Sequence, residues 1–184
     1  MTASLDILKK CQRGDSAALT TLYEIYSSRV MGLSVRYSKN RADAEDIFQE
    51  SFIRVFQGVR KVNNLESFDG WLTRTVVNTA INYYHKTKRH KDNEFLFTDS
   101  YVNEDYQLMV DHLDQEVVMG MIQRLPDGYR IVFNLYVIDG YSHPEIAQMM
   151  GCSEGNSKSQ LSRAKSILKK ELEKIGVDKY VKHA

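Results

Sequence analysis

The sequence contains only two cysteines, Cys11 and Cys152, and their spacing is not typical of a metal site or a disulfide framework. It also lacks any run approaching the about 20 apolar residues that a membrane-spanning helix requires. The first residues, Met1 to Asp15, do not include the apolar stretch of a secretory signal peptide. We therefore expect a protein of the reducing cytoplasm that does not insert directly into a membrane.

Catalytic and cofactor-binding motifs are also missing. The five histidines form no HExxH motif, and the chain has neither a nucleophile elbow nor a phosphate-cradling glycine loop. The carboxylates are concentrated in one segment and on expected solvent faces. We therefore expect that the protein is not an enzyme, takes no small-molecule substrate and needs no metal or other cofactor.

Only two prolines interrupt the chain, and helical periodicity extends through most of it. Capping residues and glycines predict helices over Ser4–Arg13, Ser16–Tyr37, Arg41–Gln57 and Ser67–Arg89, with a loop at Arg60–Glu66. We expect these elements to form one helical domain over residues 1–91. The predicted fold class is all-α.

An acidic segment follows this domain. Residues 92–116 include eight acids and no lysine or arginine, whereas residues 86–91 and 158–182 are strongly basic. Because residues 95–111 have no helical period and no caps, we expect a flexible acidic linker over 92–112. A second small helical domain should then occupy residues 113–184, which gives two modules that face nucleic acid.

Within this second domain, Tyr141–Leu172 has the pattern of two helices joined by a tight turn. Ser142 and Glu145 form a capping box, and Gly151 suits a left-handed helix end. Ser153 is placed to cap the second helix. This spacing is that of a helix-turn-helix, which places its second helix in the major groove of DNA.

Projection of the second helix at 100° per residue separates an apolar face from a polar one. The apolar face contains Leu161, Ala164, Leu168, Leu172 and Ile175. The polar side is free of acids and carries groups that bond to bases or phosphates: Asn156, Lys158, Ser159, Gln160, Arg163, Lys165 and Lys170. An ordinary solvated basic helix would have a similar composition, but the capped helix and turn before it favour DNA binding.

The helix predicted at Arg41–Gln57 has a second face away from its apolar stripe. This face carries Asp46, Gln49, Glu50 and Ile53 at helical spacing. An isoleucine framed by two acids and an amide is a candidate partner patch, although single exposed apolar residues are also common.

The helix predicted at Ser67–Arg89 likewise has a polar side. It carries an aromatic, amides and cations: Trp71, Arg74, Asn78, Asn82, Lys86 and Arg89. Such groups suit unstacked bases and phosphates. Trp71 is equally well explained as a residue that packs under the preceding loop.

These motifs together resemble the RNA polymerase sigma factors of the sigma-70 family, in the extracytoplasmic-function group. The helix-turn-helix SHPEIAQMMGCSEGNSKSQLSRAKSIL is similar to sigma region 4, with Asn156 and Ser157 in place of the usual Thr-Val and Gln160 where arginine is common. DAEDIFQESFIRVF resembles region 2.2, and ESFDGWLTRTVVNTAINYYHKTKR resembles regions 2.3 and 2.4, with Asn82 replacing a frequent aspartate. The resemblance runs from about Ala17 to Leu172.

The resemblance implies a role for each candidate surface. Asp46, Gln49, Glu50 and Ile53 would bind core RNA polymerase. The loop Lys61–Phe68, including Asn63 and Asn64, would act with the polar side of the following helix on the melted minus-10 element. The helix-turn-helix would read the minus-35 element of promoter DNA. Members of this family usually have an anti-sigma factor as inhibitor, so one is expected here.

A second function class fits the helix-turn-helix alone. A dimeric operator-binding regulator would use the same motif without polymerase, and it would recognise symmetric half-sites. Two separate sigma motifs in the expected order favour the sigma factor.

Overall fold

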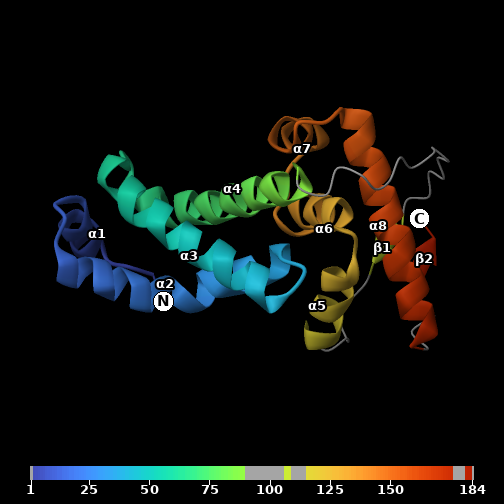
Figure 1. Cartoon of the computed structure of the whole chain (residues 1–184), viewed down its shortest axis with the longest axis horizontal. Helices are drawn as coiled ribbons and strands as arrows, with labels where there is room; N and C mark the ends of the chain where they lie inside the picture. The colour runs from blue at the N-terminus through green and yellow to red at the C-terminus, as the bar shows by residue number, and fades with distance from the viewer. Residues whose placement is uncertain (1, 90–105, 109–114, 176–180, 184) are drawn as a thin grey trace. The chain divides into compact units, whose positions relative to one another are not determined.

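The computed structural model describes residues 2–89, 106–108, 115–175 and 181–183. Internal contacts divide the chain into two compact units, Met1–Lys86 and Thr87–Ala184. The helices account for nearly all of the described structure, which confirms the all-α prediction (Figure 1). Most of the predicted linker, residues 92–112, lies outside the described residues, and its description as flexible stays a prediction. Within the described parts of the chain, no helix is both long and apolar enough to cross a bilayer.

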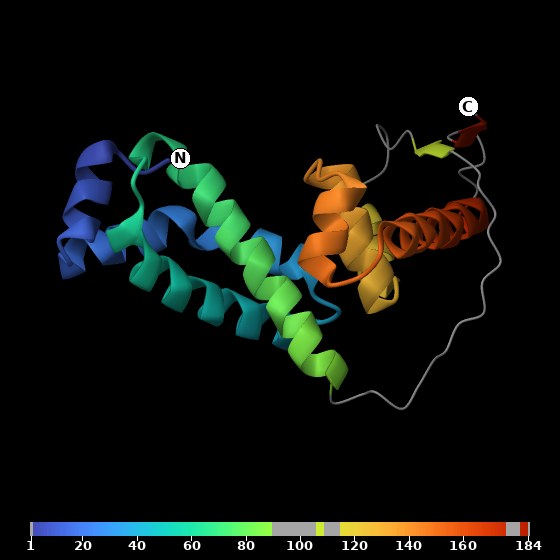
Figure 2. The ribbon, with the colours of Figure 1, turned by 90° about the horizontal axis from the view of Figure 1, so that it is seen from above.

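The first unit is built from four helices and two short 3-10 turns. The elements are α1 (Leu5–Gln12), α2 (Ser16–Tyr37), α3 (Arg41–Gly58), η1 (Val59–Lys61), η2 (Leu65–Ser67) and α4 (Phe68–Arg89). The side chains of Ser4, Asp15 and Asn40 cap the starts of the first three helices. Each accepts the backbone N–H of the residue three positions later. Figure 2 shows α4 lying across α2 and α3. The sequence predicted a loop at Arg60–Glu66. The structure adds a short 3-10 turn at each end of this loop, η1 and η2.

The core of this unit is shared by all four helices. Its buried members include Leu8, Leu22, Tyr26, Phe52 and Leu72. On α3 the buried stripe runs through Ala44, Ile47, Ser51, Phe52 and Val55, whereas the apolar Phe48 and Phe56 beside it are only half-buried.

Gly58 follows the predicted helix end at Gln57 and is the last residue of α3. Its backbone angles are right-handed and helical, with φ −82° and ψ −30°, so it is not a left-handed helix end. A methyl group at this position would lie 2.6 Å from Cζ2 of Trp71. Gly58 therefore gives the indole ring of Trp71 room to pack against the end of α3.

The second unit contains the helix-turn-helix and its support. Its elements are α5 (Gln115–Arg124), α6 (Asp127–Phe133), the π-helical turn η3 (Asn134–Ile138), α7 (His143–Met150), α8 (Glu154–Lys174) and a ribbon of β1 (Tyr106–Leu108) with β2 (Val181–His183). The strands are antiparallel, with Tyr106 opposite His183. The apolar sequence of Asp127–Ile138 is typical of one regular helix, but its last turn widens to the π form and leaves Tyr136, Val137 and Ile138 exposed.

The packing of α8 follows the predicted face for most of its length. Leu161, Ala164, Leu168 and Leu172 are buried, and α5, α6 and α7 all contact this helix (Figure 1). Ile175 was predicted to belong to the same face and is half exposed, at 50%. It follows the last helical residue, Lys174, so it no longer keeps the helical register.

Arg130 stabilises the turn between α5 and α6. Its side chain is buried, with the residue 3% exposed. Its guanidinium donates to the carbonyl oxygens of Leu125 at 2.9 Å and Gln123 at 3.2 Å, and to Oδ1 of Asp127 at 2.6 Å. These bonds satisfy carbonyls at the end of α5 and fix the start of α6.

Candidate nucleic-acid interface

The helix-turn-helix forms through the local interactions that its sequence predicted. The capping box of Ser142 and Glu145 opens α7, and the Glu145 carboxylate accepts the Ser142 backbone N–H at 2.8 Å. Gly151 ends this helix in the left-handed conformation, with φ 62°. Ser153 then caps α8 by accepting the N–H of Asn156 at 3.1 Å.

A contact between α7 and α8 was not foreseen from the sequence. Nδ1 of His143 lies 2.9 Å from Oγ of Ser157, and the Tyr136 ring stacks on the imidazole with centroids 4.5 Å apart. Ser157 is fully buried, so its hydroxyl needs a partner inside the protein. Burial, followed by the charge of Lys158, lowers the pKa of His143 and favours the neutral ring. The neutral imidazole therefore joins the two helices of the motif.

The predicted DNA-binding residues of α8 lie on its polar side. Asn156 and Lys158 are exposed, while Ser159, Gln160 and Arg163 are half-buried. The Gln160 side-chain amide donates to Oδ1 of Asn156, and Nη1 of Arg163 donates to the Tyr129 hydroxyl at 3.3 Å. These bonds restrict the orientation of amide and guanidinium groups that could contact base edges.

One acid lies closer to this surface than the sequence indicated. Glu154, in the first turn of α8, forms an ion pair with Lys158, and Oε1 of Glu154 lies 2.7 Å from Nζ of Lys158. The hydrogen bond and the charge of this pair lower the pKa of Glu154 and raise the pKa of Lys158. Both side chains are largely exposed, so the pair contributes little to stability.

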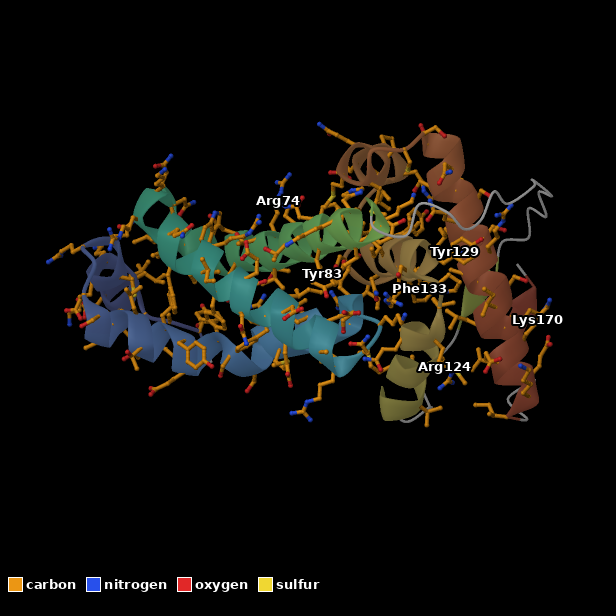
Figure 3. All side chains as sticks on the ribbon, viewed as in Figure 1. Arg74, Tyr83, Arg124, Tyr129, Phe133 and Lys170 are labelled. Carbon is orange, nitrogen blue, oxygen red and sulfur yellow. The ribbon has the colours of Figure 1, made fainter. Side chains whose placement is uncertain are left out.

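The predicted minus-10 surface spans α4 and the loop before it. Arg74, Asn78, Asn82 and Lys86 are exposed on α4, and Figure 3 shows the Arg74 side chain extending away from the helix. Asn63 and Asn64 are exposed in the loop. Asn64 also accepts the Glu66 N–H at 3.0 Å, which shapes the turn η2. Arg89 is the last residue of α4.

Trp71 differs from the other members of this surface. Its ring is half-buried, lies 5.4 Å from the Phe68 ring and packs on Gly58. This environment supports the packing interpretation of Trp71, which the sequence left open. A role for its exposed edge in binding bases stays a prediction.

The predicted polymerase-binding face of α3 is exposed to solvent. Asp46, Gln49 and Glu50 are exposed, and Ile53 is 50% exposed. Glu50 pairs with Arg54 at 2.7 Å within the helix. Asp46 lies 3.3 Å from the hydroxyl of Tyr83 on α4, a neighbour that the sequence did not predict.

Histidine, cysteine and acidic side chains are spread out over the described segments. Over these residues, no three or more histidine, cysteine or acidic side chains are grouped so that they could hold a metal ion.

Comparison with known proteins identifies both units. Residues 22–90 match the family Sigma-70 region 2, and residues 115–168 match Sigma-70, region 4. The chain is 28% identical over 180 residues to an ECF RNA polymerase sigma-E factor of Haemophilus influenzae, covering 92% of this chain and 95% of that protein. It is also 28% identical over 181 residues to an RNA polymerase sigma-H factor of Pseudomonas aeruginosa, covering 92% and 93% of the two chains.

A solved structure shares the fold. This is the sigma factor RpoE of Bartonella quintana, solved in complex with the anti-sigma factor NepR, with a TM-score of 0.50 at 21% identity. The alignment covers 86% of this chain and 97% of the other. With region 2 and region 4 both matched in order, the chain belongs to the sigma-70 family of RNA polymerase sigma factors, in its extracytoplasmic-function group.

Proposed function

We propose that this protein binds core RNA polymerase and directs promoter-specific initiation of transcription. The observation that carries this proposal is the presence of sigma regions 2 and 4 in one chain, in order, over residues 22–90 and 115–168. Its family consists of transcription initiation factors, and the proposed activity is binding without catalysis. Because the polymerase and the chromosome are in the cytoplasm, the protein would act there.

In this proposal the second unit reads the minus-35 element as duplex DNA. The helix α8 would enter the major groove, as the second helix of such motifs does. Its base and phosphate contacts would come from Asn156, Lys158, Ser159, Gln160 and Arg163. The capped α7 and the contact of His143 with Ser157 would hold α8 at a fixed angle for this task.

The first unit would capture the melted minus-10 strand. Amides and cations on α4 and its preceding loop, together with one aromatic ring, would contact bases and phosphates: Asn63, Asn64, Trp71, Arg74, Asn78, Asn82, Lys86 and Arg89. Unstacking a base costs a few kcal/mol per step, and several such contacts can offset that cost. Phosphate contacts by the cations would make this binding weaken as salt increases.

Docking on the polymerase would use the exposed face of α3. Asp46, Gln49, Glu50 and Ile53 provide two carboxylates, an amide and one apolar anchor on adjacent turns. Such a face fits a partner surface that presents basic groups around an apolar site.

The linker would let the two units bind separate promoter elements. We keep its proposed range at 92–112, between a region 2 domain at 1–91 and a region 4 domain at 113–184. About 21 residues of extended chain can span roughly 70–75 Å at 3.3–3.6 Å each, about two turns of duplex. An anti-sigma factor is the proposed inhibitory partner, by analogy with the complex of RpoE and NepR from Bartonella quintana.

The experiment that tests this function is co-elution with bacterial core RNA polymerase, followed by run-off transcription from genomic fragments. A sigma factor should assemble and give new, specific start sites. The protein could instead fail to bind polymerase and bind duplex DNA by itself at symmetric half-sites. That result would identify it as an operator-binding regulator. The match of residues 22–90 to region 2 disfavours that outcome, since such a regulator needs no polymerase-binding domain.

A further inference from the structure

Tyr83 reaches from α4 toward α3, where its hydroxyl lies close to two carboxylates (Figure 3). The hydroxyl donates to Oδ1 of Asp43 at 2.8 Å and lies 3.3 Å from Oδ2 of Asp46. Burial raises the pKa of Tyr83, and the hydrogen bonds and charges of Asp43 and Asp46 raise it further. The phenol therefore keeps its proton and remains a donor.

The two carboxylates differ in their other bonds. Oδ2 of Asp43 accepts the side-chain amide of Asn40 at 3.1 Å, and the Asp43 N–H is bonded to Asn40 Oδ1 at 2.9 Å. Asp43 is thus held within the first turn of α3. Asp46 is exposed, and among the described residues Tyr83 is the only group seen to donate to its carboxylate.

This geometry orients Asp46. With Oδ2 facing Tyr83, the other oxygen of Asp46 is available on the face that also carries Gln49, Glu50 and Ile53. A side chain held in one orientation before binding loses less conformational entropy when it pairs with a cation. The single phenol proton is shared between two carboxylates within hydrogen-bonding distance, of which Asp43 is the nearer.

We propose that Tyr83 is a positioning residue for polymerase docking, which holds the Asp46 carboxylate in the orientation that a basic group of the polymerase accepts. This inference rests on the proposed function, in which Asp46 contacts the polymerase. It also makes α4 serve both interfaces, because the helix that faces the promoter strand supports the helix that docks.

The test is a double-mutant cycle on the affinity of the full chain for bacterial core RNA polymerase. Fluorescently labelled wild type, Tyr83→Phe, Asp46→Ala and the double variant would be titrated with polymerase and followed by anisotropy. We expect Tyr83→Phe to weaken binding about three- to tenfold, less than the loss of a whole hydrogen bond to a charged group, because the variant loses only the orientation of Asp46. In the Asp46→Ala background the same change should have no further effect.

A matched control removes another tyrosine hydroxyl from the same unit. Tyr23 on α2 packs its ring on Phe48 and Phe52, and the described residues provide no hydrogen bond to its hydroxyl. Tyr23→Phe should bind polymerase like the wild type. Thermal unfolding of every variant separates a loss of docking from a loss of fold.

Three results would overturn the inference. Tyr83→Phe could bind like wild type, it could lose the same factor with and without Asp46, or Asp46→Ala could itself have no effect. Each of these leaves the proposed function intact as long as the wild type binds polymerase. A wild type that fails to bind polymerase would instead remove the proposed function.

Discussion

The hydroxyl of Tyr129 on α6 lies 3.3 Å from Nη1 of Arg163 on α8. Figure 3 shows Tyr129 on the side of α6 that meets α8, and these two helices form a major packing contact of the second unit. A residue of the supporting helix therefore restrains the guanidinium that is proposed to read DNA. An arginine held in this way has fewer orientations to lose on binding, which favours selective contact with one base or phosphate.

Arg163→Ala should weaken binding of the minus-35 element by about 1–3 kcal/mol, since a lost base contact has that cost. Tyr129→Phe should have a smaller effect, below about 1 kcal/mol, because it removes only the support of the guanidinium. Holoenzyme affinity for a promoter fragment, measured at fixed salt, checks both values. Promoter binding by Arg163→Ala at wild-type strength would contradict the proposed role of this residue.

Gly58→Ala should destabilise the first unit by about 1–3 kcal/mol. The helical backbone at Gly58 would accept alanine, so the cost comes from the methyl group, which would lie 2.6 Å from Cζ2 of Trp71. Because Trp71 is the only tryptophan in the chain, its fluorescence reports directly on this packing. We expect a shifted emission maximum together with a lower unfolding midpoint.

Gly70→Ala is the matched control for this change. Gly70 lies in the first turn of α4, and nothing lies within 4 Å of a methyl group placed there. Alanine should therefore be neutral or stabilise the helix by up to about 1 kcal/mol. Equal stability of the two variants would show that Trp71 does not need the space at Gly58.

Arg130→Ala should destabilise the second unit by about 3 kcal/mol or more. The change leaves the carbonyls of Leu125 and Gln123 without their donor and removes the partner of Asp127. Chemical unfolding of the full chain measures the loss. Arg124→Ala is the control, because its side chain is 62% exposed and lies 4.0 Å from Glu171, so its loss should stay within about 0.5 kcal/mol.

The parts of the structure that sequence reasoning predicted best depend on residues a few positions apart. Ser142 with Glu145, and Ser153 with Asn156, are each three residues apart, and their spacing alone specifies the bond. Gly151 similarly needs only its own backbone conformation to end α7. The fold class followed because such local signals repeat along the whole chain.

The parts that could not be predicted depend on tertiary approach. Tyr83 and Asp43 are 40 residues apart, and their contact exists only because α4 crosses α3. The sequence indicated only that a helix ends near Gly58, since nothing local shows that Trp71 occupies the space beside this glycine. The π-helical turn at Asn134–Ile138 was also missed, because its hydrophobic pattern resembles that of a regular helix.

Changing Gln49 or Glu50 to lysine should reduce polymerase affinity at least about tenfold, because a cation replaces an amide or an acid on the proposed docking face. Both residues are exposed, and the ion pair of Glu50 with Arg54 is at the surface, so the fold should be unaffected. Glu24→Lys, an exposed charge reversal on α2, is the control. Normal assembly of the Gln49 and Glu50 variants would show that this face does not dock.

Acid should loosen the helix-turn-helix through His143. Burial, then Lys158 and Lys165, lower the pKa of this imidazole below its ordinary 6.5, and Glu154 opposes them only in part. A histidine with a lowered folded pKa binds fewer protons in the folded state than in the unfolded state. Its contribution to stability is therefore complete above the unfolded pKa and declines as the pH falls through 6.5 toward the lowered folded value.

His143→Gln cannot titrate, so it isolates this effect from the carboxylates, which also titrate as the pH falls. The free energy of unfolding would be measured by urea at several pH values on both sides of the ordinary pKa of His143, 6.5, for wild type and variant. The stability advantage of the wild type should shrink as the pH falls, because protonation charges a ring that packs on Tyr136 and bonds Ser157. A difference that stays constant with pH would mean that His143 keeps its ordinary pKa, and that its contact with Ser157 tolerates the charged ring.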